Sequence, residues 1–241
     1  MINLLIDIGN TCTKASFAKG LELEETIIHN GADVFEFIND LAGQREVDVI
    51  AVSSVRREGE KNFSGLKSVC NKLIVVGEDT LLPVKNCYKT PGTLGSDRIL
   101  SAVAANSLFP GRDIIVFDFG TALTVDFISK KGEFKGGNIS PGLKSRFRAL
   151  SDYTQRLPLI ETPETIVKTG GSTKEAIESG VVLGLIFEVE GYIREYPHHN
   201  YIFTGGDAIY FAEKLKSSIF VVYNLVLMGL ARVADNYAKT E

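Results

Sequence analysis

One short pattern occurs twice in the chain: an apolar run ends in an Asp-x-Gly turn, and alternating residues follow the turn. Asn3-Leu4-Leu5-Ile6 precedes Asp7-Ile8-Gly9, and Ile114-Ile115-Val116-Phe117 precedes Asp118-Phe119-Gly120. Runs of β-branched and aromatic residues bounded by glycine are typical of buried strands. The second copy follows the first by 118 − 7 = 111 residues. The sequence therefore predicts two related halves, each opening with a β-hairpin.

The two turns are suited to binding phosphate. Glycine lets backbone N–H groups approach an anion closely, and a carboxylate such as Asp7 or Asp118 can hold Mg²⁺ or its water. For either hairpin alone, an ordinary turn built from Asp and Gly is the competing interpretation. A third strand, Tyr201-Ile202-Phe203, ends in Thr204-Gly205-Gly206-Asp207 and favours a nucleotide site. Aligning the two hairpins also places Thr13 on Thr124.

The segments between these strands have apolar residues at helical spacing. Val34, Phe37, Ile38 and Leu41 follow the i, i+3, i+4, i+7 pattern of one helix face. Further helices are expected at Phe63–Leu73, after Gly95–Arg98, from Ser140-Pro141, from Ser172 to Tyr196, at Ala208–Leu215 and at Asn224–Tyr237. Within the long helix, Gly180 and Gly184 are interpreted as sites of close packing. Strands that alternate with helices predict an α/β protein.

Composition excludes several classes of protein. The 26 Lys and Arg residues are outnumbered by 30 Asp and Glu residues, which gives a net charge of −4 without a basic block. Neither the three cysteines nor the three histidines have metal-ligand spacing, and the cysteine usage fits a reducing compartment. No signal peptide is expected, and no apolar run reaches the about 18–20 residues of a membrane span. We therefore expect a cytoplasmic protein with neither a nucleic-acid nor a membrane partner.

Six segments, taken in order, carry a resemblance to a known family. They are Asp7-Ile8-Gly9-Asn10-Thr11, Gly95-Ser96-Asp97-Arg98, Asp118–Ala122, Gly136–Gly142, Ser172-Thr173 and Thr204-Gly205-Gly206. The first resembles the phosphate motif of the acetate and sugar kinase, Hsp70 and actin superfamily. The series as a whole resembles the type III pantothenate kinases, from residue 2 to the last helix.

The resemblance implies two related ribonuclease-H-like domains, the actin-like ATPase fold, with an ATP cleft between them. We expect domains at residues 1–107 and 108–241, with the last helix packing back on the first domain. The implied activity is ATP-dependent phosphorylation of pantothenate to 4′-phosphopantothenate, the first step of coenzyme A biosynthesis. A homodimer, Mg²⁺ with ATP, and a monovalent cation (K⁺ or NH₄⁺) are implied as well.

The resemblance also implies roles for individual residues. Asp97 is the expected general base, although a carboxylate at a helix N-terminus is also favoured by the helix dipole alone. Asp118 is the expected ligand of the monovalent cation. The expected substrate-binding residues are Tyr88, Gly95, Ser96, Asp97, Arg98 and Thr173. The expected ATP-binding residues are Asp7, Ile8, Gly9, Asn10, Thr11, Cys12, Thr13, Lys14 and Thr121.

The chain departs from the family pattern at two places. Leu123 stands where the family usually has a second Thr, and Gly171-Ser172 replaces a commoner Lys-Asn. The first change removes a hydroxyl that would lie near the nucleotide. Two alternative functions remain open: a kinase of another small alcohol in the same superfamily, and a non-catalytic regulator that retains the fold.

Overall fold

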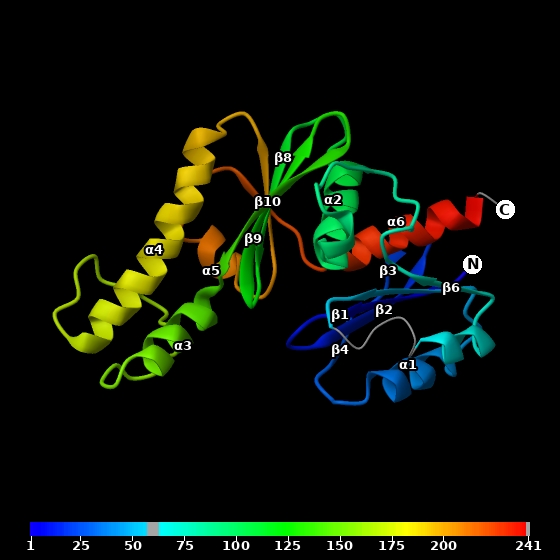
Figure 1. Cartoon of the computed structure of the whole chain (residues 1–241), viewed down its shortest axis with the longest axis horizontal. Helices are drawn as coiled ribbons and strands as arrows, with labels where there is room; N and C mark the ends of the chain where they lie inside the picture. Colours follow the sequence, from blue (N-terminus) through cyan, green and yellow to red (C-terminus); the bar gives the residue numbers. More distant parts are fainter. Residues whose placement is uncertain (57–62, 240–241) are drawn as a thin grey trace. The chain divides into compact units, whose positions relative to one another are not determined.

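The computed structural model describes residues 1–56 and 63–239 (Figure 1). These residues form two compact units. Unit 1 contains Met1–Arg112, Ile128–Gly136 and the C-terminal segment from Asn224, and unit 2 contains Asp113–Phe127 and Gly137–Tyr223. The sequence-predicted boundary after residue 107 stays a prediction.

Unit 1 is built on a sheet with the strand order β3-β2-β1-β5-β6, in which β4 also pairs with β2. The strands of this sheet are β1 (Asn3–Ile8), β2 (Thr13–Lys19), β3 (Glu22–Leu23), β4 (Ile27–His29), β5 (Val49–Ser54) and β6 (Lys72–Val75). Unit 1 also contains the short strand β7 (Lys85–Asn86), which pairs with β10 in the second sheet. Its helices are α1 (Val34–Ala42), α2 (Ser96–Leu108) and α6 (Leu225–Lys239). Strand β1 is antiparallel to β2 and parallel to β5, so the predicted first hairpin is confirmed.

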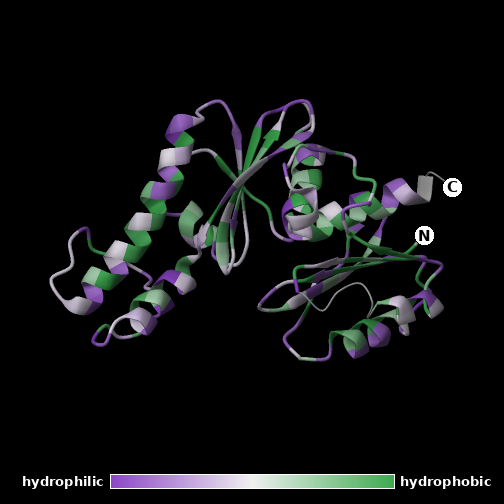
Figure 2. Ribbon diagram, in the orientation of Figure 1, coloured by the Kyte–Doolittle hydropathy of each residue, from purple (hydrophilic) through white to green (hydrophobic). Residues whose placement is uncertain are grey.

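Both faces of this sheet are covered, because successive side chains of a strand point to opposite faces. Leu4 and Ile6 of β1 belong to the core that includes α1, whereas Leu5 belongs to the core with α2 and α6. Figure 2 shows the resulting hydrophobic colouring of the central strands. Helices α2 and α6 approach closely, since a Cβ added at Gly229 would lie 2.2 Å from the carbonyl oxygen of Leu100.

The second sheet has the strand order β12-β11-β8-β9-β10-β7. Its remaining strands are β8 (Ile114–Phe119), β9 (Ala122–Ser129), β10 (Glu133–Pro141), β11 (Asn200–Thr204) and β12 (Ile219–Val221). The helices of unit 2 are α3 (Leu143–Tyr153), α4 (Thr173–Glu195) and α5 (Ala208–Ala212). Strand β8 is parallel to β11, which places the ends of both strands at one edge.

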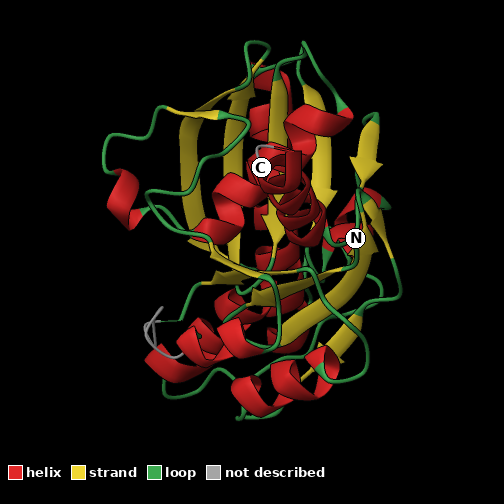
Figure 3. Ribbon diagram, turned by 90° about the vertical axis from the view of Figure 1, so that its right-hand side faces the viewer, coloured by secondary structure: helices red, strands yellow, loops and turns green. Residues whose placement is uncertain are grey.

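The core of unit 2 joins one face of its sheet to α3, α4 and α5. Phe117 and Leu123 of the sheet, Phe147 of α3, Leu185 of α4 and Phe211 of α5 are all members, each at most 1% exposed. Figure 3 distinguishes these helices and strands by colour. The predicted capping box begins α4 as expected, because Ser172 Oγ accepts a hydrogen bond from Glu175 N at 3.3 Å. The predicted α/β class is confirmed.

Three local predictions are wrong. The helix expected over Phe63–Leu73 is a 3₁₀ turn at Ser64–Ser68 followed by strand β6, because Leu73 joins the sheet beside β5. Ser140-Pro141 ends strand β10, and the helix begins at Leu143. Gly180 does not mark close packing, since a Cβ added there would meet nothing within 4 Å.

The two hairpins also differ in turn length, which corrects the alignment between them. Four residues separate β1 from β2, and two separate β8 from β9. Thr13 is therefore the first residue of its strand, whereas Thr124 is the third residue of β9. The Asp and Gly positions match between the copies, and the threonines do not.

Candidate active site

The first turn, which connects β1 to β2, is closed by a hydrogen bond from Gly9 N to Cys12 O at 3.1 Å. Asp7, one residue before the last residue of β1, is half-buried. In register it lies between Lys14 of β2 and Ser53 of β5. Paired residues of neighbouring strands point to the same face of a sheet. Asp7, Lys14 and Ser53 therefore share the sheet face that carries α2.

Thr13 and Ile8 lie on the opposite face of the same sheet. They pair with each other, and both are at most 3% exposed. Thr13 Oγ1 is buried without a hydrogen-bond partner among the described residues. The structure thus separates the predicted ATP residues into a group beside α2 and a group beneath the turn. Asn10 and Thr11, at the tip of the turn, are exposed.

The beginning of α2 is tied to the end of β5. Ser53 Oγ and Ser96 Oγ are hydrogen-bonded at 2.9 Å, and Ser96 Oγ also donates to Ser54 O at 3.2 Å. Because Ser53 pairs with Asp7, these bonds place the start of α2 at the sheet edge that carries the first turn. Asp97, the second residue of α2, belongs to this same edge.

Asp97 is half-buried and folded back on its own backbone. Its Oδ1 accepts a hydrogen bond from Arg98 N at 2.8 Å, and a Cβ added at Gly95 would lie 2.5 Å from that oxygen. Glycine at position 95 therefore leaves room for the carboxylate. Burial raises the pKa of Asp97, and the Arg98 N–H group and the Arg98 charge act in the opposite direction. A carboxylate with a raised pKa is better suited to accept a proton.

Arg98 and Tyr88, both predicted to bind substrate, lie together in unit 1. The guanidinium carbon of Arg98 lies 5.6 Å from the centre of the Tyr88 ring and 5.8 Å from that of Phe134. Arg98 is only 6% exposed. Gly136 has a φ of 105°, and a Cβ added there would lie 3.4 Å from the Tyr88 ring. The backbone of Gly136 thus packs closely against the Tyr88 ring.

The second turn, between β8 and β9, is held from outside by the segment that begins α3. The carbonyl oxygen of Thr121 accepts hydrogen bonds from Gly142 N at 3.0 Å and from Ser145 Oγ at 2.6 Å. A Cβ added at Gly142 would lie 2.2 Å from Gly120 O. Gly142 therefore permits a backbone approach that no other residue allows.

A set of polar contacts supports this segment in turn. Arg146 Nε donates to Pro141 O at 2.8 Å, and Arg146 also forms an ion pair with Glu188 of α4. Ser140 Oγ donates to Glu188 Oε1 at 2.7 Å. Sequence reasoning missed Ser145 and Glu188. Glu188 lies 42 residues from Arg146, so no local pattern could reveal the pair.

Asp118 lies at the end of β8, in register with Thr204 of β11. Gly205 has a φ of 91°, and a Cβ added there would lie 2.4 Å from Asp118 Oδ1. Only glycine fits this place, because the carboxylate and a left-handed backbone occur together. Nearby, burial raises the pKa of Asp207, and the Lys144 charge acts in the opposite direction.

Two further positions clarify the departures from the family pattern. Leu123 is 0% exposed and belongs to the core of unit 2, so its side chain points away from the surface that carries Thr124. A threonine at position 123 would therefore place its hydroxyl in the core of unit 2, and not on the face of β9 that carries Thr124. Thr173 is exposed and is the first residue of α4, directly after the capping Ser172.

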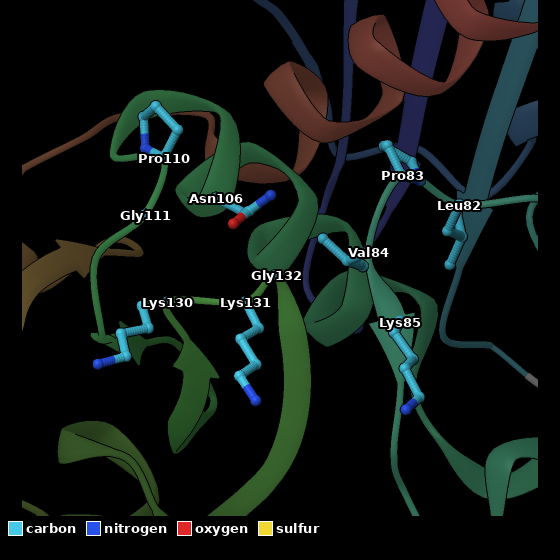
Figure 4. Close-up of a pocket in the computed structure, with 10 residues that line it drawn as sticks. All are labelled: Leu82, Pro83, Val84, Lys85, Asn106, Pro110, Gly111, Lys130, Lys131 and Gly132. Atoms are coloured by element: carbon cyan, nitrogen blue, oxygen red, sulfur yellow. The ribbon is translucent and has the colours of Figure 1, made fainter.

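A cavity of about 530 Å³ lies elsewhere in unit 1 (Figure 4). It is lined by Leu82, Pro83, Val84, Lys85, Asn106, Pro110, Gly111, Lys130, Lys131 and Gly132. None of these lining residues is a sequence-predicted site residue. In Figure 4 the side chain of Lys130 points away from those of Lys85 and Lys131, so the three lysines do not converge.

Within residues 1–56 and 63–239, no group of three or more His, Cys, Asp and Glu side chains forms a metal centre. One carboxylate stands at each of the two turns instead, Asp7 at the first and Asp118 at the second. Mg²⁺ is usually bound by one or two carboxylates together with phosphate oxygens and water. The arrangement therefore fits an ion that arrives with a nucleotide.

Comparison with known proteins identifies the family. The profile of a family described as type III pantothenate kinase matches residues 3–195. The chain belongs to the type III pantothenate kinases. A type III pantothenate kinase of Cytophaga hutchinsonii is 39% identical over 238 residues, covering 97% of this chain and 99% of its own. One of Phocaeicola vulgatus is 40% identical over 237 residues, covering 96% and 97%.

Solved structures show the same fold at much lower identity. A Campylobacter jejuni protein described as a Baf family transcriptional activator has a TM-score of 0.67 at 22% identity, covering 98% of this chain and 99% of its own. The ROK hexokinase of Thermus thermophilus has a TM-score of 0.57 at 11% identity and covers all of both chains. These likenesses confirm the predicted fold of this pantothenate kinase family member, the two-domain ribonuclease-H-like fold. Among the described residues, no helix has the length and apolar character needed to cross a bilayer.

Proposed function

We propose that this chain transfers the γ-phosphoryl group of ATP to the primary hydroxyl of pantothenate, with Asp97 as the general base. Membership of the type III pantothenate kinases supports the substrate and the reaction. The observation that carries the role of Asp97 is its half-buried carboxylate, tied through Ser96 and Ser53 to the sheet edge of the first phosphate turn. A helix-capping role alone would not require burial that raises the pKa of this carboxyl.

The reaction needs an activated alcohol and a stabilised phosphoryl group. Asp97 accepts the hydroxyl proton of pantothenate while the alcohol oxygen forms a bond to the γ-phosphorus. The bond from that phosphorus to the bridging oxygen of ADP breaks, and ADP leaves with the electron pair. General base catalysis of this kind contributes about 10²- to 10⁴-fold in rate. Positioning and charge stabilisation supply the remainder of the rate enhancement.

Substrate binding is assigned to the group around Tyr88 and Arg98. Pantothenate carries a carboxylate, and a guanidinium can hold a carboxylate through two parallel hydrogen bonds. Gly95, the N-cap of α2, and Ser96, its first residue, directly precede Asp97 and are assigned to the same substrate site. Thr173, exposed at the beginning of α4, is assigned as a further substrate contact. These roles follow the family motifs at the matching positions of this chain.

The two ions are assigned to the two turns. Mg²⁺ would neutralise charge on the ATP phosphates, and Asp7 would hold it or its water. Asp118 would bind a monovalent cation, K⁺ or NH₄⁺, at the end of β8. Backbone N–H groups of Gly9–Lys14 and of Thr121 would face the phosphates.

A homodimer in the cytoplasm, where ATP is supplied, completes the proposal. Helix α4 presents an exposed strip in this chain, on which Phe187 is 63% exposed and Gly180 has open space. An exposed aromatic side chain on a long helix is suited to a contact with a second copy of the chain.

An ADP-release assay tests the reaction. The purified protein is given Mg²⁺-ATP and pantothenate in K⁺ or in Na⁺, with no pantothenate and a panel of sugars as controls. We expect pantothenate-dependent ADP release that is faster in K⁺, and we expect Asp118→Asn to abolish the K⁺ preference. Absence of turnover with pantothenate in K⁺ would overturn the proposal, and turnover with a sugar alone would favour the alternative kinase. Retained K⁺ activation in Asp118→Asn would place the cation elsewhere.

A further inference from the structure

The first phosphate turn is held by an arginine that lies outside every motif named above. Arg56 Nε donates a hydrogen bond to the carbonyl oxygen of Gly9 at 2.9 Å, and the two residues are 47 positions apart. The contact follows from the parallel pairing of β1 and β5, which continues as a bond from Val55 N to Ile8 O at 3.1 Å. Sheet register therefore fixes this half-buried arginine at the first turn.

Among residues 1–56 and 63–239, most donors of the Arg56 guanidinium have no bonding partner. A guanidinium has five N–H donors, and the bond to Gly9 uses one of them. The only other bond of Arg56 in the described part of the chain joins its backbone N to Ser54 Oγ at 3.3 Å. Withdrawing a charged side chain from water costs free energy unless an opposite charge compensates it. An anion bound in the turn would supply that charge.

The charge around the turn also calls for a further cation. Asp7 adds a carboxylate next to the turn, and the whole chain has a net charge of −4. Lys14 of β2 is the cross-strand neighbour of Asp7. A cationic side chain at this turn would add to the positive charge that Mg²⁺ brings with the triphosphate.

We propose that Arg56 is a nucleotide-binding residue: Nε holds the Gly9 carbonyl, and the Nη groups donate to a phosphate oxygen of ATP. The inference rests on the proposed function, because it takes ATP as the ligand. The planar guanidinium is suited to phosphate oxygens, and its single bond to Gly9 fixes its orientation in advance. Because the contact is to phosphate, it strengthens with the number of phosphates on the nucleotide.

The test compares the binding of ATP, ADP and AMP to Arg56→Gln by titration calorimetry. Glutamine keeps one donor for the Gly9 carbonyl and removes the charge. Arg45→Gln is the matched control, because it removes the same charge from unit 1 at a residue that contacts Glu24 and the Phe17 ring. We expect Arg56→Gln to weaken ATP binding about 10-fold or more and AMP binding about 2-fold or less. We expect Arg45→Gln to bind all three nucleotides like the wild type.

Other results would overturn the proposal. Equal weakening for ATP, ADP and AMP would mean that Arg56 only supports the turn, and unchanged ATP affinity would mean that it has no part in binding. If Arg56→Gln fails to fold, Arg56→Lys retains the charge and should keep a dependence of affinity on phosphate number. KM for pantothenate should not change in either variant. A wild-type protein that binds ATP but releases no ADP with pantothenate would contradict the proposed function and leave the Arg56 contact standing.

Discussion

The two turns share the Asp-x-Gly pattern, but different parts of the chain hold them in place. The first turn has four residues, and a guanidinium side chain, Arg56, donates to its Gly9 carbonyl. The second turn has two residues, and Thr121 O accepts from the backbone of Gly142 and from the Ser145 hydroxyl.

The first turn has room to adjust, whereas the second turn is closely packed. A Cβ at Gly9 would lie 3.1 Å from Cys12 O, a distance that a small backbone shift can relieve. A Cβ at Gly142 would lie 2.2 Å from Gly120 O, where backbone meets backbone. The longer turn thus depends on the charged side chain of Arg56, and the shorter turn depends on the absence of a side chain at position 142. Neither turn contains the proposed base, Asp97, which belongs to α2.

The largest expected effect distinguishes the proposed proton transfer to Asp97 from nucleotide binding at the two turns. Asp97→Asn should lower kcat by about 10²- to 10⁴-fold, because the amide cannot accept the hydroxyl proton. The dissociation constant of ATP should stay nearly unchanged, since the proposal assigns nucleotide binding to the turns and not to Asp97. Steady-state kinetics and calorimetric titration with ATP measure the two quantities. An equal loss of ATP affinity would make Asp97 a metal ligand or a structural residue.

The pH dependence of activity and of stability provides a second test of Asp97. Burial raises the pKa of Asp97, so kcat/KM of the wild type should fall on the acid side at a higher pH than an ordinary aspartate, with a pKa of about 3.9, would give. The raised pKa also means that the charged form destabilises the fold. Asp97→Asn should therefore be more stable than wild type above the raised pKa, and this advantage should vanish as the pH falls toward about 4. Thermal unfolding across that range checks the sign.

The next effect tests the two glycines as a matched pair. Gly142→Ala should lower the free energy of unfolding by about 1–3 kcal/mol, because its Cβ forces the Gly120–Thr121 backbone to move. Gly9→Ala should lower it by less than about 1 kcal/mol, because its contact is relieved by a small shift. Urea denaturation followed by circular dichroism measures both variants. Equal losses would show that the two turns are packed alike.

How far the sequence predicts these features depends on the distance between interacting residues. The hairpins, α1 and the capping box at Ser172 follow from residues that are close in the sequence, and these predictions are confirmed. Leu73 matched a helical spacing locally, but its pairing with Ile50 of β5 makes it part of a strand. The contacts of Arg56 and Glu188 span more than 40 residues. Such contacts depend on sheet register and helix packing, which no local pattern encodes.

The smallest effect tests the support behind the second turn. Glu188→Gln keeps an acceptor for Ser140 Oγ and removes the charge opposite Arg146, so the start of α3 should hold Thr121 less firmly. We expect KM for ATP to rise about 2- to 5-fold with kcat unchanged. Glu178→Gln is the control on the same helix, because it removes a largely buried carboxylate whose partner is the exposed Lys174 and not Arg146. A rise of the same size in Glu178→Gln would trace the effect to α4 as a whole. A rise only in Glu188→Gln would mean that the second turn depends on packing around it, as the first turn depends on one guanidinium.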